Sequence, residues 1–305
     1  MTDHLYGARA EDLLKGGIDL HHHGYPEISL DVRTRTDDVT ELTLARDAGM
    51  AAIVLKSHMF PTMGRAYHLS RLVEGIDVVS SITLNPVVGG FSPLAVETAG
   101  RLGAKALFMP TWGAAHDRSR KGFSRHLAEF IKSAENLTQQ PGLTVTDESG
   151  RVRSEVRECL AVAAEFGMMV ATAHISPRES IALAGAAKDC GIGSIFFQHP
   201  DSNSVAATRD DIRELAALDA VCEICALGLL PPFQRISVGA VREIVEEIGP
   251  AKCALTTDYF FDWAPPAAET LRMIIGVFLS QGISADDIRI MIRDTPARLL
   301  GRRTT

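Results

Sequence analysis

Short apolar runs with the character of β-strands alternate with amphipathic helical patterns along most of the chain. Eight such runs are present, at residues 18–23, 52–58, 78–84, 104–110, 169–174, 194–199, 220–225 and 251–258. Strands that alternate with helices indicate parallel strands joined by crossover helices.

Start and stop signals support the helices between these runs. Ser92-Pro93 and Ser176-Pro177 each offer an N-cap serine followed by proline at the first helical position, and Thr36-Asp37-Asp38 places carboxylates in a first turn. Glycines such as Gly49 and Gly191 stand where a helix should end before the next strand. Eight such units predict a (β/α)₈ TIM barrel. A doubly wound open sheet is the competing fold, but it would not favour polar residues at so many strand ends.

One connection is longer than the rest. Residues 111–158, after the fourth strand, contain a helical pattern at 123–135 and an alternating segment at 143–152 that turns at Ser149-Gly150. This insertion is expected to be either a lid over the active-site face or a packed excursion. We expect residues 1–17 to be a lead-in and residues 18–305 to form a single domain.

Composition excludes several classes of protein. A net charge of −7 without a basic run argues against a nucleic-acid surface. No apolar run approaches the length of about 18 residues that a membrane span needs, and the first residues lack the pattern of a signal peptide. The five cysteines include Cys222 and Cys225 in a C-x-x-C, but both fall in a predicted strand. We interpret the five as reduced thiols of a cytoplasmic protein.

The first predicted strand ends in three histidines. In a regular strand Asp19, His21 and His23 share one face, and Leu20 and His22 share the other. Two imidazoles on one face can meet a divalent ion at about 2.0–2.1 Å. A surface run of histidines is the alternative, but an apolar segment leads directly into this one.

Other strands end in residues suited to the same chemistry. Lys56 and His58 follow Val54 on one face of the second strand, and the remaining residues of this kind are His174, His199, Glu223 and Asp258. A single histidine at a strand end is more often a satisfied polar residue than a ligand. Four histidines and an aspartate at the expected C-terminal ends predict a metal centre, because barrel active sites are built there.

In this order the residues resemble the amidohydrolase superfamily of metal-dependent barrel hydrolases. The superfamily pattern is an H-x-H on strand 1, one histidine on each of strands 5 and 6, and an aspartate on strand 8. Here it is matched by His21, His23, His174, His199 and Asp258. The ending Asp294-Thr295-Pro296-Ala297-Arg298-Leu299-Leu300-Gly301 is similar to the N-P-A-R-x-L-G that closes many such chains, and residues 54–58, V-L-K-S-H, are typical of one branch.

The resemblance implies one or two divalent ions per chain, most often zinc, with manganese as an alternative. His21, His23 and Asp258 would bind the buried ion, whereas His174 and His199 would bind a second ion or the substrate. A metal-bound hydroxide would attack the substrate, and Asp258 would carry the proton to the leaving group.

Lys56 departs from the superfamily pattern, in which a carboxylated lysine usually comes from strand 4. It would be a carboxylated metal ligand, a cation that holds an anionic substrate, or a Schiff-base nucleophile. Glu223 would be a metal ligand, a substrate contact or a carboxylate that balances Lys56, and His58 would contact the substrate.

These residues predict a metal-dependent hydrolase that acts on an amide, cyclic amide, ester or lactone, with Asp258, Lys56 and His199 as catalytic residues. A metal-dependent decarboxylase or C–C lyase and a non-catalytic ligand-binding barrel are the alternatives. The expected partners are a small-molecule substrate and further copies of the chain in a homo-oligomer.

Overall fold

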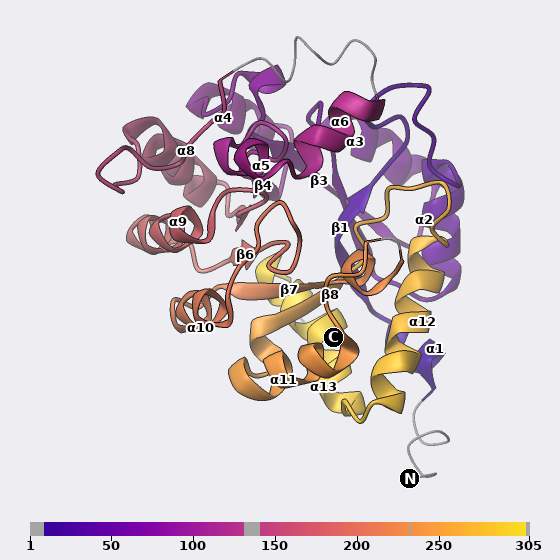
Figure 1. Cartoon of the computed structure of the whole chain (residues 1–305). Coiled ribbons are helices and arrows are strands. Elements are labelled where there is room, and N and C mark those ends of the chain that lie inside the picture. Colours follow the sequence, from indigo (N-terminus) through magenta and orange to yellow (C-terminus); the bar gives the residue numbers. More distant parts are fainter. Residues whose placement is uncertain (1–8, 131–140, 232, 303–305) are drawn as a thin grey trace.

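Eight parallel strands form a single barrel in the order β1 to β8, as the sequence predicts (Figure 1). The computed structural model describes residues 9–130, 141–231 and 233–302. The backbone closes the barrel between its first and last strands, because Asp258 N donates to His21 O at 2.9 Å and His23 N donates to Tyr259 O at 3.0 Å. The strands are β1 (Ile18–His23), β2 (Ala52–Lys56), β3 (Asp77–Thr83), β4 (Ala106–Phe108), β5 (Met169–Ala171), β6 (Ile195–Phe197), β7 (Val221–Cys225) and β8 (Cys253–Thr256).

Helices surround the barrel (Figure 1). Two of the expected start signals are confirmed, since Ser92 and Ser176 accept a hydrogen bond from the backbone of the first turn of their helices; at the third, the N-cap is Asp37. None of the described helices is long and apolar enough to cross a lipid bilayer. The α-helices are α1 (Ala10–Leu14), α2 (Asp38–Asp47), α3 (Met63–Leu72), α4 (Pro93–Arg101), α5 (Ala115–Arg120), α6 (Phe123–Phe130), α8 (Ser154–Glu165), α9 (Pro177–Asp189), α10 (Arg209–Ala217), α11 (Val238–Ile248), α12 (Ala267–Ser280), α13 (Ala285–Arg289) and α14 (Thr295–Leu299). Shorter helical turns are η2 (Pro86–Val88), η3 (Ala226–Leu229), η4 (Pro250–Lys252) and the π-helical η5 (Ile290–Asp294).

The barrel interior changes from apolar to polar along the strands. Its lower part is filled by side chains such as Val54, Phe108 and Phe196, with Ala297 and Leu299 of α14 in the same cluster. Further along β2 and β7, the same inward positions carry Lys56 and Glu223, which are 0% and 1% exposed. An apolar floor therefore supports a buried layer of charged groups at the C-terminal ends of the strands.

The expected alternation of β1 is wrong at its centre. The pairing of β1 with β2 advances three residues from Asp19 to His22 but only two from Ile53 to Leu55, which is a β-bulge. As a result Leu20 packs in the apolar interior. Asp19 shares a face with His22 instead of with His21, and Asp19 Oδ2 lies 4.0 Å from His22 Nδ1. Bulges insert one residue and re-aim the side chains that follow, and this one turns His21 and His23 toward the barrel mouth.

Several predicted strands end earlier than expected, because the functional residues leave the strand ladder. His174, His199 and Asp258 all follow the last residue of their strand. His199 and Asp258 have φ angles of 52° and 51°, a left-handed conformation that few residues other than glycine adopt. The backbone thus turns sharply where these two side chains enter the site. Strained backbone conformations of this kind often occur at functional sites.

The predicted insertion after the fourth strand, residues 111–158, lies within the described residues except at 131–140. The helix expected at 123–135 agrees with α6 as far as Phe130, and residues 131–140 lie outside the described residues. The expected hairpin is reduced to one antiparallel bridge between Thr146 and Val152. The extent of the insertion, its role as a lid and the domain boundaries remain predictions.

Close packing between α4 and α8 makes Gly100 a sensitive position. A Cβ at Gly100 would meet the ring of Phe166, at the end of α8, whereas a Cβ at Gly185 in α9 would meet nothing within 4 Å. We therefore expect Gly100→Ala to lower the free energy of unfolding by about 1–3 kcal/mol through overpacking. The matched change Gly185→Ala should raise it by up to about 1 kcal/mol, because alanine favours a helix. Urea denaturation of the two variants measures this difference, and equal stabilities would contradict the packing described for Gly100.

Candidate metal centre

Two imidazoles of β1 meet the carboxylate of Asp258 at the barrel mouth. Asp258 Oδ1 lies 2.9 Å from His21 Nε2 and 3.2 Å from His23 Nε2. Both histidines are completely buried, and the Asp258 side chain is 14% exposed. The three side chains thus place two ring nitrogens and one oxygen around a common point.

Carboxylates hold the other ring nitrogen of three histidines. His21 Nδ1 lies 2.8 Å from Glu223 Oε1, His23 Nδ1 lies 3.2 Å from Glu27 Oε1, and His174 Nδ1 lies 2.9 Å from Asp117 Oδ2. An ionised carboxylate can only accept, so each pair favours a proton on Nδ1 and leaves Nε2 as the free ligand atom. Carboxylates behind metal-binding histidines orient the rings in this way in many metal sites.

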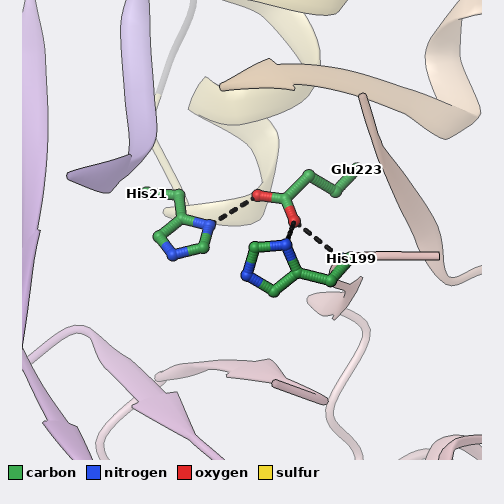
Figure 2. Close-up of side chains that lie close together, drawn as sticks. All are labelled: His21, His199 and Glu223. Atoms are coloured by element: carbon green, nitrogen blue, oxygen red, sulfur yellow. Dashed lines mark hydrogen bonds and ion pairs between the residues drawn. The ribbon is translucent and has the colours of Figure 1, made fainter. Parts of the chain in front are cut away.

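Glu223 links the first strand to the sixth. Figure 2 shows its carboxylate between the rings of His21 and His199. Besides His21, it accepts a hydrogen bond from the backbone N–H of His199 at 2.8 Å, and its Oε1 accepts one from Thr256 Oγ1 at 2.7 Å. Glu223 is buried and does not line the cavity described below, so in this structure it lies behind the histidines.

The structure brings all five residues of the predicted pattern together. The ring of His199 lies 4.8 Å from that of His21 and 5.1 Å from that of His174, measured between centroids. His199 Nε2 is 3.8 Å from Asp258 Oδ2. His23 therefore lies at one carboxylate oxygen of Asp258, and His199 lies nearer the other.

Lys56 and His58 also reach this cluster. Lys56 is fully buried, with Nζ 2.9 Å from His21 Nε2 and 5.1 Å from the ring centroid of Phe108. His58 stacks on His23 with 4.4 Å between centroids, and its Nδ1 contacts Thr111 Oγ1 at 2.9 Å. Lys56 thus lies below the centre, whereas His58 lies beside it.

Burial leaves most of the imidazoles neutral. It lowers the pKa of His58 and His174, and it lowers that of His199 to about 3, because neighbouring carboxylates offset only part of the cost of burying the charge. His21 differs: burial opposes its charged form, but Asp258 and Glu223 together raise its pKa to about 9. Burial would raise the pKa of Asp258, yet His21 holds it well below its ordinary value.

The donor set fits a divalent metal ion. The buried Nε2 of His23 has no hydrogen-bond partner among the described residues, although Asp258 Oδ1 is 3.2 Å away. Ligands of one tetrahedral zinc, at bonds of about 2.0–2.2 Å, lie roughly 3.3 Å apart, close to this separation. Three other sets of side chains around the same centre, all buried except Asp258, also bring ligand atoms within 4.8 Å of one another: His21–His199–Glu223, His23–Glu27–His58 and His199–Cys225–Asp258. Neutral imidazole and carboxylate are the forms that bind zinc.

A cavity of about 130 Å³ opens above these groups. His58, His174, His199 and Asp258 line its inner end, and α6 contributes Phe123 to its wall. His58 is thus placed where it can contact a substrate, and that contact remains a prediction.

Three residues of the centre were not predicted from the sequence. Glu27 and Asp117 lie in a loop and in the short helix α5, where carboxylates are common. Only their contacts with His23 and His174 show that they belong to the centre. Cys225 lines the cavity, but Cys222 packs in the outer core, so the C-x-x-C points to two sides of β7. All five cysteines are free, as expected.

Several solved structures share the eight-stranded parallel barrel fold of this chain. An amidohydrolase from Pseudomonas aeruginosa matches at 12% identity and a TM-score of 0.65, covering 96% of this chain and 98% of that one. An amidohydrolase from Burkholderia multivorans matches at 14% identity and a TM-score of 0.58, covering 94% and 99%. A mutant PTE-like lactonase from Deinococcus radiodurans matches at 15% identity and a TM-score of 0.53, covering 97% and 98%.

The sequence itself belongs to one defined family. A family model described as "Family of unknown function (DUF6282)" matches residues 16–223, which is more than half of the chain, so the protein is a member of that family. No curated protein matches the sequence significantly.

Proposed function

We propose that this protein is a metal-dependent hydrolase of an amide, cyclic amide, ester or lactone carbonyl. The observation that carries the proposal is the meeting of His21 Nε2 and His23 Nε2 with Asp258 Oδ1 at the mouth of the barrel, with a carboxylate behind each imidazole. The solved structures of the same fold that are named as amidohydrolases and lactonases support it.

The residues of the centre divide into proposed metal ligands and residues that position them. His21, His23 and Asp258 would hold the buried ion, and His174 and His199 would complete the ligand set from the cavity side. Glu27, Asp117 and Glu223 keep the rings of their partner histidines in place through Nδ1. Zinc is the proposed metal, because imidazole and carboxylate ligands suit it well, and manganese is the alternative.

A divalent cation bound there would act as a Lewis acid and make water acidic enough to yield hydroxide near neutral pH. Asp258, whose Oδ1 lies 2.9 Å from His21 Nε2 and 3.2 Å from His23 Nε2, would accept the proton of the attacking water. It then gives that proton to the leaving nitrogen or oxygen as the bond to the carbonyl carbon breaks. If only one ion is bound, His199, which lines the cavity with Nε2 3.8 Å from Asp258 Oδ2, would instead orient the carbonyl.

Removal and return of the metal test the proposal. Untagged protein purified without chelator should contain one or two equivalents of divalent metal by mass spectrometry and turn over a member of a panel of esters, lactones and amides. Treatment with dipicolinate should abolish both, and added zinc should restore both. Stoichiometric metal without turnover would instead identify a binding barrel, and release of CO₂ without consumption of water a decarboxylase or lyase. Absence of metal after incubation with zinc or manganese would contradict the proposed centre.

Location and assembly remain part of the proposal. Free thiols throughout support a reducing compartment such as the cytoplasm. We also propose association into a homo-oligomer, for which the exposed side chains of Leu72 and Leu94, at 68% and 72%, are candidate contacts.

A further inference from the structure

The cavity above the centre is lined by two kinds of side chain. Phe123, Phe233, Phe260 and Phe261 form an aromatic wall. The polar residues of the lining include Ser202 and Asn203, from the loop after β6, and Arg235. A ligand that fills this space meets both flat apolar surface and polar groups.

The aromatic wall begins directly at the metal centre. The ring of Phe123 stacks on that of His58 with 4.3 Å between centroids, and the ring of Phe260 lies 5.5 Å from that of His23. Phe123 and Phe260 are 5.9 Å apart. Apolar contact is therefore available to the part of a substrate that lies next to the reacting carbonyl.

The same wall continues outward without a break. Phe260 meets Phe261 at 4.9 Å, and Phe261 stacks on Phe233 at 4.8 Å, with an angle of 22° between the two rings. These separations fall within the range of about 4.5–7 Å at which aromatic rings attract each other. A planar ring inserted here would extend an existing series of ring contacts.

The size of the cavity suits an aromatic ring. Its volume of about 130 Å³ is close to that of an apolar cavity of about 150 Å³ known to hold benzene. A six-membered ring therefore fits this space.

The polar part of the lining includes a group without a partner. Ser202 Oγ is buried and makes no hydrogen bond to any described residue, although it belongs to a residue that lines the cavity. A buried hydroxyl without a partner is costly, so a bound ligand or water is expected to satisfy it. A polar substituent on a ring bound at the aromatic wall would serve this purpose.

From these observations we infer that the substrate is an aryl carbonyl compound, with an aromatic ring within one or two bonds of the hydrolysed carbonyl and a polar substituent on that ring. This substrate class rests on the proposed function, since it assigns the reacting carbonyl to the centre of His21, His23 and Asp258. The aromatic wall binds the ring, and Ser202 contacts its polar substituent.

Two hydroxamates with the same metal-binding group test the inference. Isothermal titration of the zinc-loaded protein should show benzohydroxamate binding at least about tenfold more tightly than acetohydroxamate, because a buried ring gains apolar contact and stacking. Phe233→Ala should reduce this preference at least about threefold while leaving the affinity for acetohydroxamate unchanged. Phe60→Ala, which removes an exposed phenylalanine outside the cavity, is the matched control and should keep the full preference. Equal affinities for the two hydroxamates, or an unchanged preference in Phe233→Ala, would overturn the inference.

A ligand without a metal-binding group separates this inference from the proposed function. Saturation-transfer NMR with benzyl alcohol should show binding to the metal-free protein and its loss in Phe233→Ala. If neither hydroxamate binds but benzyl alcohol does, the proposed metal centre fails and the aromatic subsite stands. If the hydroxamates bind equally and benzyl alcohol does not bind, the metal centre stands and the aryl substrate class is wrong.

Discussion

His21→Ala and Asp258→Ala should each lose nearly all bound metal and at least about a thousandfold in kcat/KM. The metal supplies several kcal/mol of transition-state stabilisation, and each 1.4 kcal/mol corresponds to about a tenfold change in rate. Asp258 contributes a second effect, because it is also the proposed proton carrier. Metal content by mass spectrometry and turnover of the best panel substrate, measured on the same preparations, check both expectations.

The middle histidine provides the control. His22 faces away from the centre and stacks on Tyr259, with 5.0 Å between centroids and an angle of 9° between the rings. His22→Phe keeps that stack and removes both nitrogens, so it should retain metal content and turnover within a few-fold. Normal activity in the double variant His21→Ala plus Asp258→Ala would refute the proposed chemistry. Loss of metal in His22→Phe with a folded chain would show that the assignment within the triplet is wrong.

Lys56→Arg should weaken metal binding at least about a hundredfold, whereas Lys56→Met should still bind an ion. Lys56 Nζ lies 2.9 Å from His21 Nε2, the nitrogen proposed to bind the metal. Burial lowers the pKa of Lys56, so its amine can give up its charge, but an arginine there stays charged. Two unit charges about 4 Å apart repel by about 4 kcal/mol at an effective dielectric constant near 20, which is roughly a thousandfold in affinity.

Metal titration with a competing chelator distinguishes the possible roles of Lys56. If the wild type holds two ions and Lys56→Met holds one, then Lys56 is a carboxylated ligand that bridges them. If both hold one ion and only KM for an anionic substrate rises, Lys56 is a cation that binds the substrate. Wild-type affinity in Lys56→Arg would contradict the contact with His21 in the metal-loaded protein.

Much of the fold could be predicted from the pattern of the sequence. All eight strands and their order are confirmed, because apolar runs with helix caps between them define each βα unit locally. The ends of the strands could not be predicted. His199 and Asp258 adopt left-handed backbone conformations, which neither residue type indicates in the sequence. The strand pattern therefore extends over residues that have already left the sheet.

The candidate site could be predicted only in part. The sequence order identified His21, His23, His174, His199 and Asp258, since strand ends of a barrel converge wherever they occur in the chain. Glu27 and Asp117 were out of reach, because their pairing with His23 and His174 depends on how two loops fold over the barrel mouth. The joining of these phenylalanines into one aromatic wall was also not predicted, because Phe123, Phe233 and Phe260 come from three separate segments of the chain.

The bulge in β1 has a consequence for how this centre can be gained or lost in evolution. Leu20 and His21 both serve the barrel interior only because one extra residue is accommodated between Asp19 and His22. If the strand alternated strictly from Leu20 onward, His22 would face the barrel interior, and His21 and His23 would face away from it. Loss of function in a descendant would then arise with every ligand residue still in place. The local pairing of this strand is therefore as informative about a relative's chemistry as the identity of its histidines.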